Sequence, residues 1–412
     1  MRAVLVMLAV AGCYNPTPPA GVACVDNDGC PSGQDCIAGF CGGSGGSVDA
    51  QSDTQPADAP AICSTWQPRH FDPCMLPAPI GDLNLTDALS GFGWDTDAPQ
   101  LKGKMNTLID VATIVIQQTG GPDVVVASVN NLTMEAGATL DLNGSRPLLI
   151  AVWGTATING SIDADAAFGA AGPGGSGGLS SANGCGSGPT GDFGAAGAPA
   201  TGGGGGALQG GGGRGGNTGG AGGAMLMPPT EIRGGCAAGG GGAGSGANGV
   251  RGGGGGALQI SARQAIVIGS PASIHAAGGG GGGGRLSLGG GGGGGAGGYI
   301  GFDAPMVTIA GTVSANGGAG GGGASDVADG TTGANGRGDA TAALGGAGAA
   351  TSNVGACARG GNGSAGGTLV GATAPNSACG GAGGGGGAGY ILIWSPTLDV
   401  TGTASPPVTA GP

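Results

Sequence analysis

Four polar residues occupy the same place in a pattern that repeats along the chain. Each follows an apolar residue shortly after a turn glycine, and the four are Asp141, Asp163, His275 and Ser314. If the repeats stack, these side chains form a column, and clustered carboxylates or basic groups are what polysaccharide lyases and hydrolases require. A strand that alternates between buried and exposed positions also needs a polar residue here. We therefore interpret the column as a weak polar ladder and predict no catalytic residue.

Other catalytic and ligand-binding motifs are absent or uninformative. The chain has no G-x-x-x-x-G-K-[ST] loop, no H-E-x-x-H pair and no convincing G-x-S-x-G elbow, and G-x-G-x-x-G recurs through composition alone. Arg337-Gly338-Asp339 spells an adhesion tripeptide, but a chance match is the simpler explanation in a chain so rich in glycine. We predict no enzymatic activity, no cofactor and no metal site.

The 11 cysteines favour an oxidising compartment. Setting Cys13 aside leaves an even number, as a disulfide framework requires. Four of them fall within 18 residues, which leaves no room for an apolar core, and zinc is the less favoured alternative because no CxxC pair is present. Proximity along the chain predicts the pairs Cys63–Cys74, Cys185–Cys236 and Cys357–Cys379. The four clustered cysteines are Cys24, Cys30, Cys36 and Cys41.

Short β-rich runs, each ending at a glycine turn, recur five times after residue 108. The uninterrupted spacing from Gly137 to Gly160 is 23 residues, the size of one coil of a parallel β-helix. We predict a mainly β fold in which residues 109–412 form such a solenoid, in preference to a sandwich of antiparallel hairpins. The surplus between later turns is nearly all glycine, so we expect insertions from one corner at about 165–256, 277–297 and 316–388.

The glycine tracts contain most of the 109 glycines in the 412 residues. They are either disordered or folded through backbone packing, for which polyglycine-II helices are suited because glycine has no Cβ. Ordering glycine carries a large entropic cost, which crosslinks within the tracts would lessen. The cysteines inside the tracts therefore favour order.

The first residues have the parts of a secretory signal. Arg2 precedes an apolar run at residues 3–11, and Gly12 and Cys13 follow. We expect a signal peptide over 1–12, a proline-rich tether over 13–23, a disulfide module over 24–41, a disordered linker over 42–62 and a cap over 63–108. The apolar run is too short to span a bilayer as a helix.

Three segments resemble known families. Leu8-Ala9-Val10-Ala11-Gly12-Cys13 resembles the bacterial lipobox, which implies that Cys13 is acylated; an ordinary signal with a chance cysteine is the alternative. The C-x5-C-x5-C-x4-C spacing of residues 24–41 resembles small modules in exported proteins of myxobacteria and their relatives. Glycine stretches such as residues 215–223 resemble the repeats of mycobacterial PE-PGRS proteins, although that family's helical N-terminal domain is missing here.

Together these features predict an exported lipoprotein, anchored at the outer membrane or cell surface, with a structural or adhesive role. Its expected partners are the membrane, through the lipid, and a surface glycan, matrix or protein ligand. The net charge of −12 argues against nucleic acid. The alternative is a polysaccharide-acting enzyme on the same scaffold, which a groove with two carboxylates in catalytic proximity would favour.

Overall fold

A computed structural model describes residues 34–37, 40–43, 63–86, 91–103, 106–167, 169–176, 185, 194–196, 199–244 and 247–412. The chain divides into two units, Met1–Ile62 and Cys63–Pro412. In the first unit, β1 (Gln34–Ile37) pairs antiparallel with β2 (Phe40–Gly43), and Cys36 is disulfide-bonded, so it is not a zinc ligand. The expected signal peptide, tether, lipidated Cys13 and linker, together with Cys24 and Cys30, lie outside the described residues.

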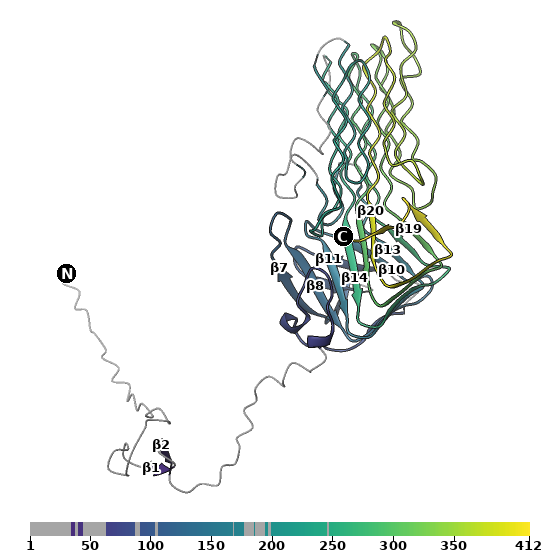
Figure 1. Cartoon of the computed structure of the whole chain (residues 1–412). Coiled ribbons are helices and arrows are strands. Elements are labelled where there is room, and N and C mark those ends of the chain that lie inside the picture. Colours follow the sequence, from purple (N-terminus) through teal and green to yellow (C-terminus); the bar gives the residue numbers. More distant parts are fainter. Residues whose placement is uncertain are drawn as a thin grey trace, which may run out of the picture. The chain divides into compact units, whose positions relative to one another are not determined.

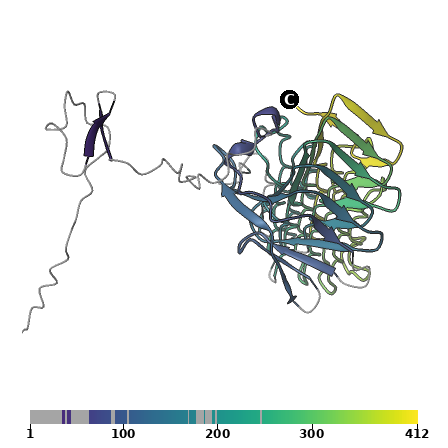
Figure 2. The ribbon, with the colours of Figure 1, turned by 90° about the horizontal axis from the view of Figure 1, so that it is seen from below.

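The second unit is mainly β, with short 3-10 turns at Cys63–Thr65 and Pro73–Met75 and strands in three parallel-rich sheets (Figures 1 and 2). Sheet I runs in the order β22 (Thr403–Ser405), β19 (Thr312–Ser314), β16 (Ser273–His275), β13 (Ser161–Asp163), β10 (Thr139–Asn143), β4 (Gly91–Asp95), β5 (Gln100–Lys102) and β6 (Leu108–Ile109). Sheet II runs β23 (Thr409–Ala410), β20 (Tyr390–Trp394), β17 (Tyr299–Asp303), β14 (Ala257–Ala262), β11 (Leu148–Val152), β8 (Val124–Val129) and β7 (Ala112–Ile116). Sheet III runs β21 (Thr397–Val400), β18 (Met306–Ile309), β15 (Ala265–Ile268), β12 (Thr155–Ile158), β9 (Leu132–Met134) and β3 (Leu83–Leu85).

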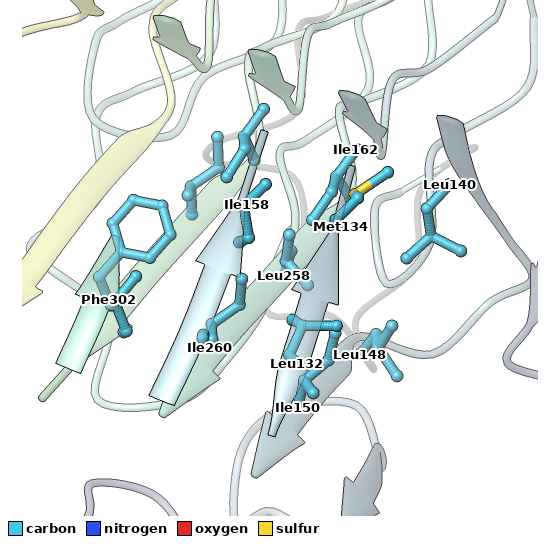
Figure 3. Packing of buried hydrophobic residues seen from close by; sticks show 14 of the residues in the cluster. Leu132, Met134, Leu140, Leu148, Ile150, Ile158, Ile162, Leu258, Ile260 and Phe302 are labelled. Atoms are coloured by element: carbon cyan, nitrogen blue, oxygen red, sulfur yellow. The ribbon is translucent and has the colours of Figure 1, made fainter. Parts of the chain in front are cut away.

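Each sequence repeat contributes one strand to each sheet, and the repeats pair in parallel from β8 to β22. The alternative of an antiparallel sandwich is therefore wrong. Apolar residues at alternate positions of the strands stack on their equivalents and fill the interior between the sheets (Figure 3). Leu140, Ile162, Ile274 and Val313 form one such stack, and each is completely buried. No repeat could bury this face alone, so stacking is what makes the fold stable.

The three sheets of paired repeats, which we call the stack, begin earlier in the chain than expected. The expected boundary between residues 108 and 109 falls inside β6. Strand β3 already pairs in parallel with β9, and β4 pairs in parallel with β10. The following strands β5, β6 and β7 turn antiparallel and close this end. Turn glycines do not mark these first strands, which is why the repeat pattern missed them.

The three glycine-rich insertions leave the same corner of the repeat, between sheet I and sheet II. They occupy residues 164–256, 276–298 and 315–389, against expected ranges of about 165–256, 277–297 and 316–388. In the first complete repeat the same corner is a short turn at residues 144–147. Figure 1 shows the insertions running away from the sheets as long extended segments in teal, green and yellow.

The described parts of these insertions are ordered and largely buried, so the alternative of wholly disordered tracts is wrong for them. One segment of each insertion meets the other two through backbone hydrogen bonds that recur at every third residue. Gly291, Gly294 and Gly297 donate to Gly381, Gly384 and Gly387 at 2.8, 2.9 and 2.9 Å. Gly384 and Gly387 donate to Gly203 and Gly206, which in turn donate to Gly291 and Gly294. Three segments thus form a closed triangle, the glycine bundle.

Three of the expected disulfides are present in the second unit. Cys63–Cys74 closes the loop at the start of the unit, Cys185–Cys236 closes 51 residues within the first insertion, and Cys357–Cys379 closes 22 residues within the third. The last two crosslink the glycine tracts, where the entropic cost of ordering is greatest.

Candidate functional site

The polar column lies on one ladder of sheet I. Asp141 is the Cα partner of Asp163, Asp163 of His275, and His275 of Ser314. The ladder continues to Ser405, which stands at the same place in the fifth repeat but was not among the residues predicted for the column. Adjacent members are therefore about 4.8 Å apart along the stack.

Burial shifts the pKa values of Asp141 and His275 toward their neutral forms, while the charge of Asp163 adds to that shift at Asp141 and opposes it at His275. The pKa of Asp141 is raised, mainly by desolvation and further by the nearby charge of Asp163. The pKa of His275 is lowered by desolvation, which outweighs the stabilising charge of Asp163, so the ring is neutral at pH 7. Its Nδ1 lies 2.8 Å from Oγ of Ser314.

Asp165 lies two residues after Asp163 and belongs to the same cluster. It was not predicted as a site residue from the sequence. Its pKa is raised to about 7, first by burial and then by Asp163, while a hydrogen bond from the backbone N–H of Ala277 lowers it. The Asp165 N–H donates to Oδ1 of Asp163 at 2.7 Å. The i, i+2 spacing, which places both side chains on one face of an extended segment, was the only available indication.

Residues 336–339 of the third insertion, which we call the strap, cross over this ladder. Asn316 holds the strap, because its Nδ2 donates to the carbonyls of Arg337 and Asp339 at 2.7 and 2.6 Å. The Oγ of Ser405 donates in turn to Oδ1 of Asn316 at 2.6 Å. The strap backbone is so close to His275 that a Cβ added to Gly338 would lie 2.5 Å from Cε1 of the ring.

The covered part of the ladder is poorly accessible to a substrate. A serine beside a neutral imidazole is the beginning of a nucleophilic pair, but Ser314 is 0% exposed and the strap covers the ring. The ends of the Arg337-Gly338-Asp339 tripeptide pair with each other, at 3.2 Å between Nη2 and Oδ2. Among the five ladder residues, Asp141 alone is exposed. It lines an open hollow of about 360 Å³ with Asp95, Lys102 and Asn143.

Within the described residues, no group of three or more His, Cys, Asp or Glu side chains is arranged to hold a metal ion. In that same part of the chain, no helix has the length and apolar character needed to cross a membrane.

No protein-family model matches the chain, and no curated protein or solved structure matches it either.

Proposed function

We propose that this chain is an exported cell-surface lipoprotein with a structural or adhesive role, and that its glycine bundle is the surface it presents. The observation that carries the proposal is the closed triangle of hydrogen bonds that joins all three insertions. A rigid backbone lattice with few charged side chains is suited to broad contact with another surface. The nucleophile candidate Ser314, by contrast, has no exposed surface.

The scaffold in this proposal is a parallel β-helix. One strand per repeat in each of three sheets, with every repeat paired in parallel to the next, is the pairing such a solenoid requires. Insertions in repeat folds gather on one face, and here they leave one corner. The bundle is thereby held at a single edge of a stable core.

The bundle in this proposal consists of polyglycine-II helices. That helix has three residues per turn and no internal hydrogen bonds, so its N–H groups point to neighbours at every third residue. Gly293 illustrates the packing, because it donates to Gly239 and accepts from Gly252, both at 2.9 Å. A Cβ at Gly293 would lie 2.1 Å from the carbonyl oxygen of Gly204, so only glycine permits this approach.

Export and lipid anchorage are supported by the lipobox-like residues before Cys13 and by the disulfides, which persist in oxidising compartments. An acyl chain at Cys13, followed by the proline-rich segment 13–23, would hold the second unit away from the membrane.

The test is adhesion of cells that display the full chain, compared with cells expressing the Cys13→Ala variant. We expect display to increase attachment to glycan-coated surfaces or to neighbouring cells several-fold, and Cys13→Ala to abolish the gain while the protein still appears in the medium. Unchanged attachment despite full surface display would overturn the adhesive role.

A polysaccharide-acting enzyme is the second candidate, because Asp141 and Asp163 are directly paired on adjacent strands and Asp141 is exposed. Close carboxyl pairs are typical of retaining glycosidases. Release of reducing ends or unsaturated products from envelope polysaccharide, abolished by Asp141→Asn, would favour this function over the structural one.

A further inference from the structure

Residues 63–76, the clasp, cover the outer face of sheet II. The disulfide Cys63–Cys74 closes the clasp, and Trp66 is 7% exposed within an apolar cluster on that face. The Trp66 ring meets Trp153 and Phe71 edge to face, at centroid distances of 5.3 and 5.4 Å. Three of the four tryptophans of the chain, Trp66, Trp153 and Trp394, pack in or against this cluster.

Several contacts fix the clasp to the stack. The Arg69 N–H donates to Oδ2 of Asp303 at 2.6 Å, and Nε2 of Gln259 donates to the Arg69 carbonyl at 3.4 Å. His70 meets Trp394 edge to face at 5.4 Å. The indole of Trp394 is held from its other end, because Nε1 donates to the carbonyl of Pro412 at 3.1 Å. A site between the clasp and the stack is therefore built from groups that are already ordered.

Such a site exists as an open groove of about 500 Å³. Its stack wall consists of the same corner in three successive repeats, at residues 262–264, 303–305 and 394–396, and residues 65–67 of the clasp form the rest. Because paired strands are about 4.8 Å apart, the three corners repeat along the groove at that interval. This shape suits an extended ligand.

The lining of the groove combines apolar rings with polar groups that can still form hydrogen bonds to a ligand. Trp394 is half-buried, and Pro305 and Pro396 are exposed. The Arg263 guanidinium makes no ion pair among the residues that the structure describes. Gln264 accepts a hydrogen bond from Oγ1 of Thr155 at 3.3 Å, which leaves its NH2 group available as a donor.

Charge in the groove is balanced. One guanidinium, Arg263, and one carboxylate, Asp303, line it beside the amides of Gln67 and Gln264. A polyanionic ligand would meet a chain of net charge −12, and a polycation would meet Arg263. Vicinal hydroxyls match planar amide, guanidinium and carboxylate groups, and the C–H faces of a sugar ring match an indole, whose apolar body carries a polar N–H.

We propose that this groove binds a linear, neutral oligosaccharide, with Trp394 as the apolar platform and Arg263, Gln264 and Gln67 as hydrogen-bonding groups. The inference rests on the proposed adhesive function and assigns it a ligand class and a site.

In the experiment, the purified full chain is titrated with cellohexaose, laminarihexaose and chitohexaose. Binding is measured by calorimetry and by tryptophan fluorescence. We expect at least one hexasaccharide to bind with a fluorescence change. Gln264→Ala and Arg263→Ala, both at accessible positions, should each weaken binding at least threefold, and Trp394→Ala should weaken it at least tenfold. Arg359→Ala, an exposed arginine outside the groove, is the matched control and should bind as the unaltered chain does.

Absence of binding to all three hexasaccharides would overturn the proposal, as would binding that neither Arg263→Ala nor Gln264→Ala weakens in folded protein. The outcome is separable from that of the adhesion test. Cells displaying Gln264→Ala that still adhere, while the purified variant has lost the sugar, would leave the adhesive role standing and remove the groove from it.

Discussion

Gly338 lies directly against the imidazole of His275, where a Cβ would come within 2.5 Å of Cε1 and 2.9 Å of Nε2. The contact joins the third insertion to a strand of sheet I. It places the strap against the imidazole of the polar ladder, which would otherwise be more accessible.

Gly338→Ala should lift the strap from His275, because the new methyl group cannot share the space of the ring. Overpacking of this kind costs about 1–3 kcal/mol. We expect faster amide exchange in residues 336–341 and a lower Tm. Gly367→Ala is the control, since nothing lies within 4 Å of a Cβ there and its backbone is not left-handed. Equal exchange and equal Tm in the two variants would contradict the close contact.

Gly386→Ala should disrupt the glycine bundle far more than Gly367→Ala. A Cβ at Gly386 would lie 1.9 Å from the carbonyl oxygen of Gly295, and both residues are buried among backbone atoms that cannot move aside singly. We expect a loss of about 3 kcal/mol or more, or failure to fold, by analogy with severe overpacking. Thermal unfolding and limited proteolysis of the insertions would measure it, and a Tm within 2 °C of the control, roughly 1.5 kcal/mol or less for a chain of this size, would argue against tight packing.

Removing the crosslinks should loosen the insertions selectively. Loop-closure entropy predicts losses of about 4 kcal/mol for the Cys185–Cys236 pair and about 3 kcal/mol for Cys357–Cys379 when each pair is changed to serine. Exchange should rise in the affected insertion and stay unchanged in strands such as β11. If amide exchange in the insertions is the same in the variant and in the unaltered chain, the disulfides are not needed to order the tracts.

Asp165 should make stability depend on pH in an unusual direction. Its folded-state pKa of about 7 exceeds the ordinary 3.8, so its contribution is fully present below the ordinary value and is lost as pH rises through about 7. Asp165→Asn keeps an acceptor for the Ala277 N–H and cannot ionise. The variant should therefore gain stability over the unaltered chain by a few kcal/mol at pH 8, and little at pH 4.

Comparison of the two proteins at each pH separates this effect from the histidines. The pKa values of His70 and His275 are lowered by burial, so their contributions are present above about 6.5 and are lost as pH falls. These contributions largely cancel in the difference between Asp165→Asn and the unaltered chain. A difference that does not grow between pH 4 and pH 8 would contradict the burial of a titrating Asp165.

The repeated part of the fold could be predicted because each repeat carries its own register marks. A turn glycine followed by an apolar and then a polar residue places Ile162 inward and Asp163 outward, and the same rule aligned His275 two strands away from Asp141. The disulfides within the insertions followed from proximity alone, since the first and third tracts hold two cysteines each and the second holds none.

Other features could not be predicted because they depend on contacts between unrelated segments. The strap reaches His275 from residue 338 through an insertion without periodicity, so neither its path nor the burial of Ser314 has a local pattern. The pKa of Asp165 is raised mainly by the burial of its own carboxyl group, which its neighbours in the sequence do not reveal. The groove joins residue 66 to residue 394, which are brought together only by the packing of the clasp on sheet II.

The most direct test of the account is residue-resolved amide hydrogen exchange of the glycine bundle in the full chain. We predict that Gly291, Gly294 and Gly297, which donate to Gly381, Gly384 and Gly387, exchange as slowly as amides of the neighbouring strand β17. Exchange at the rate of an unstructured peptide at all three glycines would contradict an ordered bundle, and with it the proposed surface.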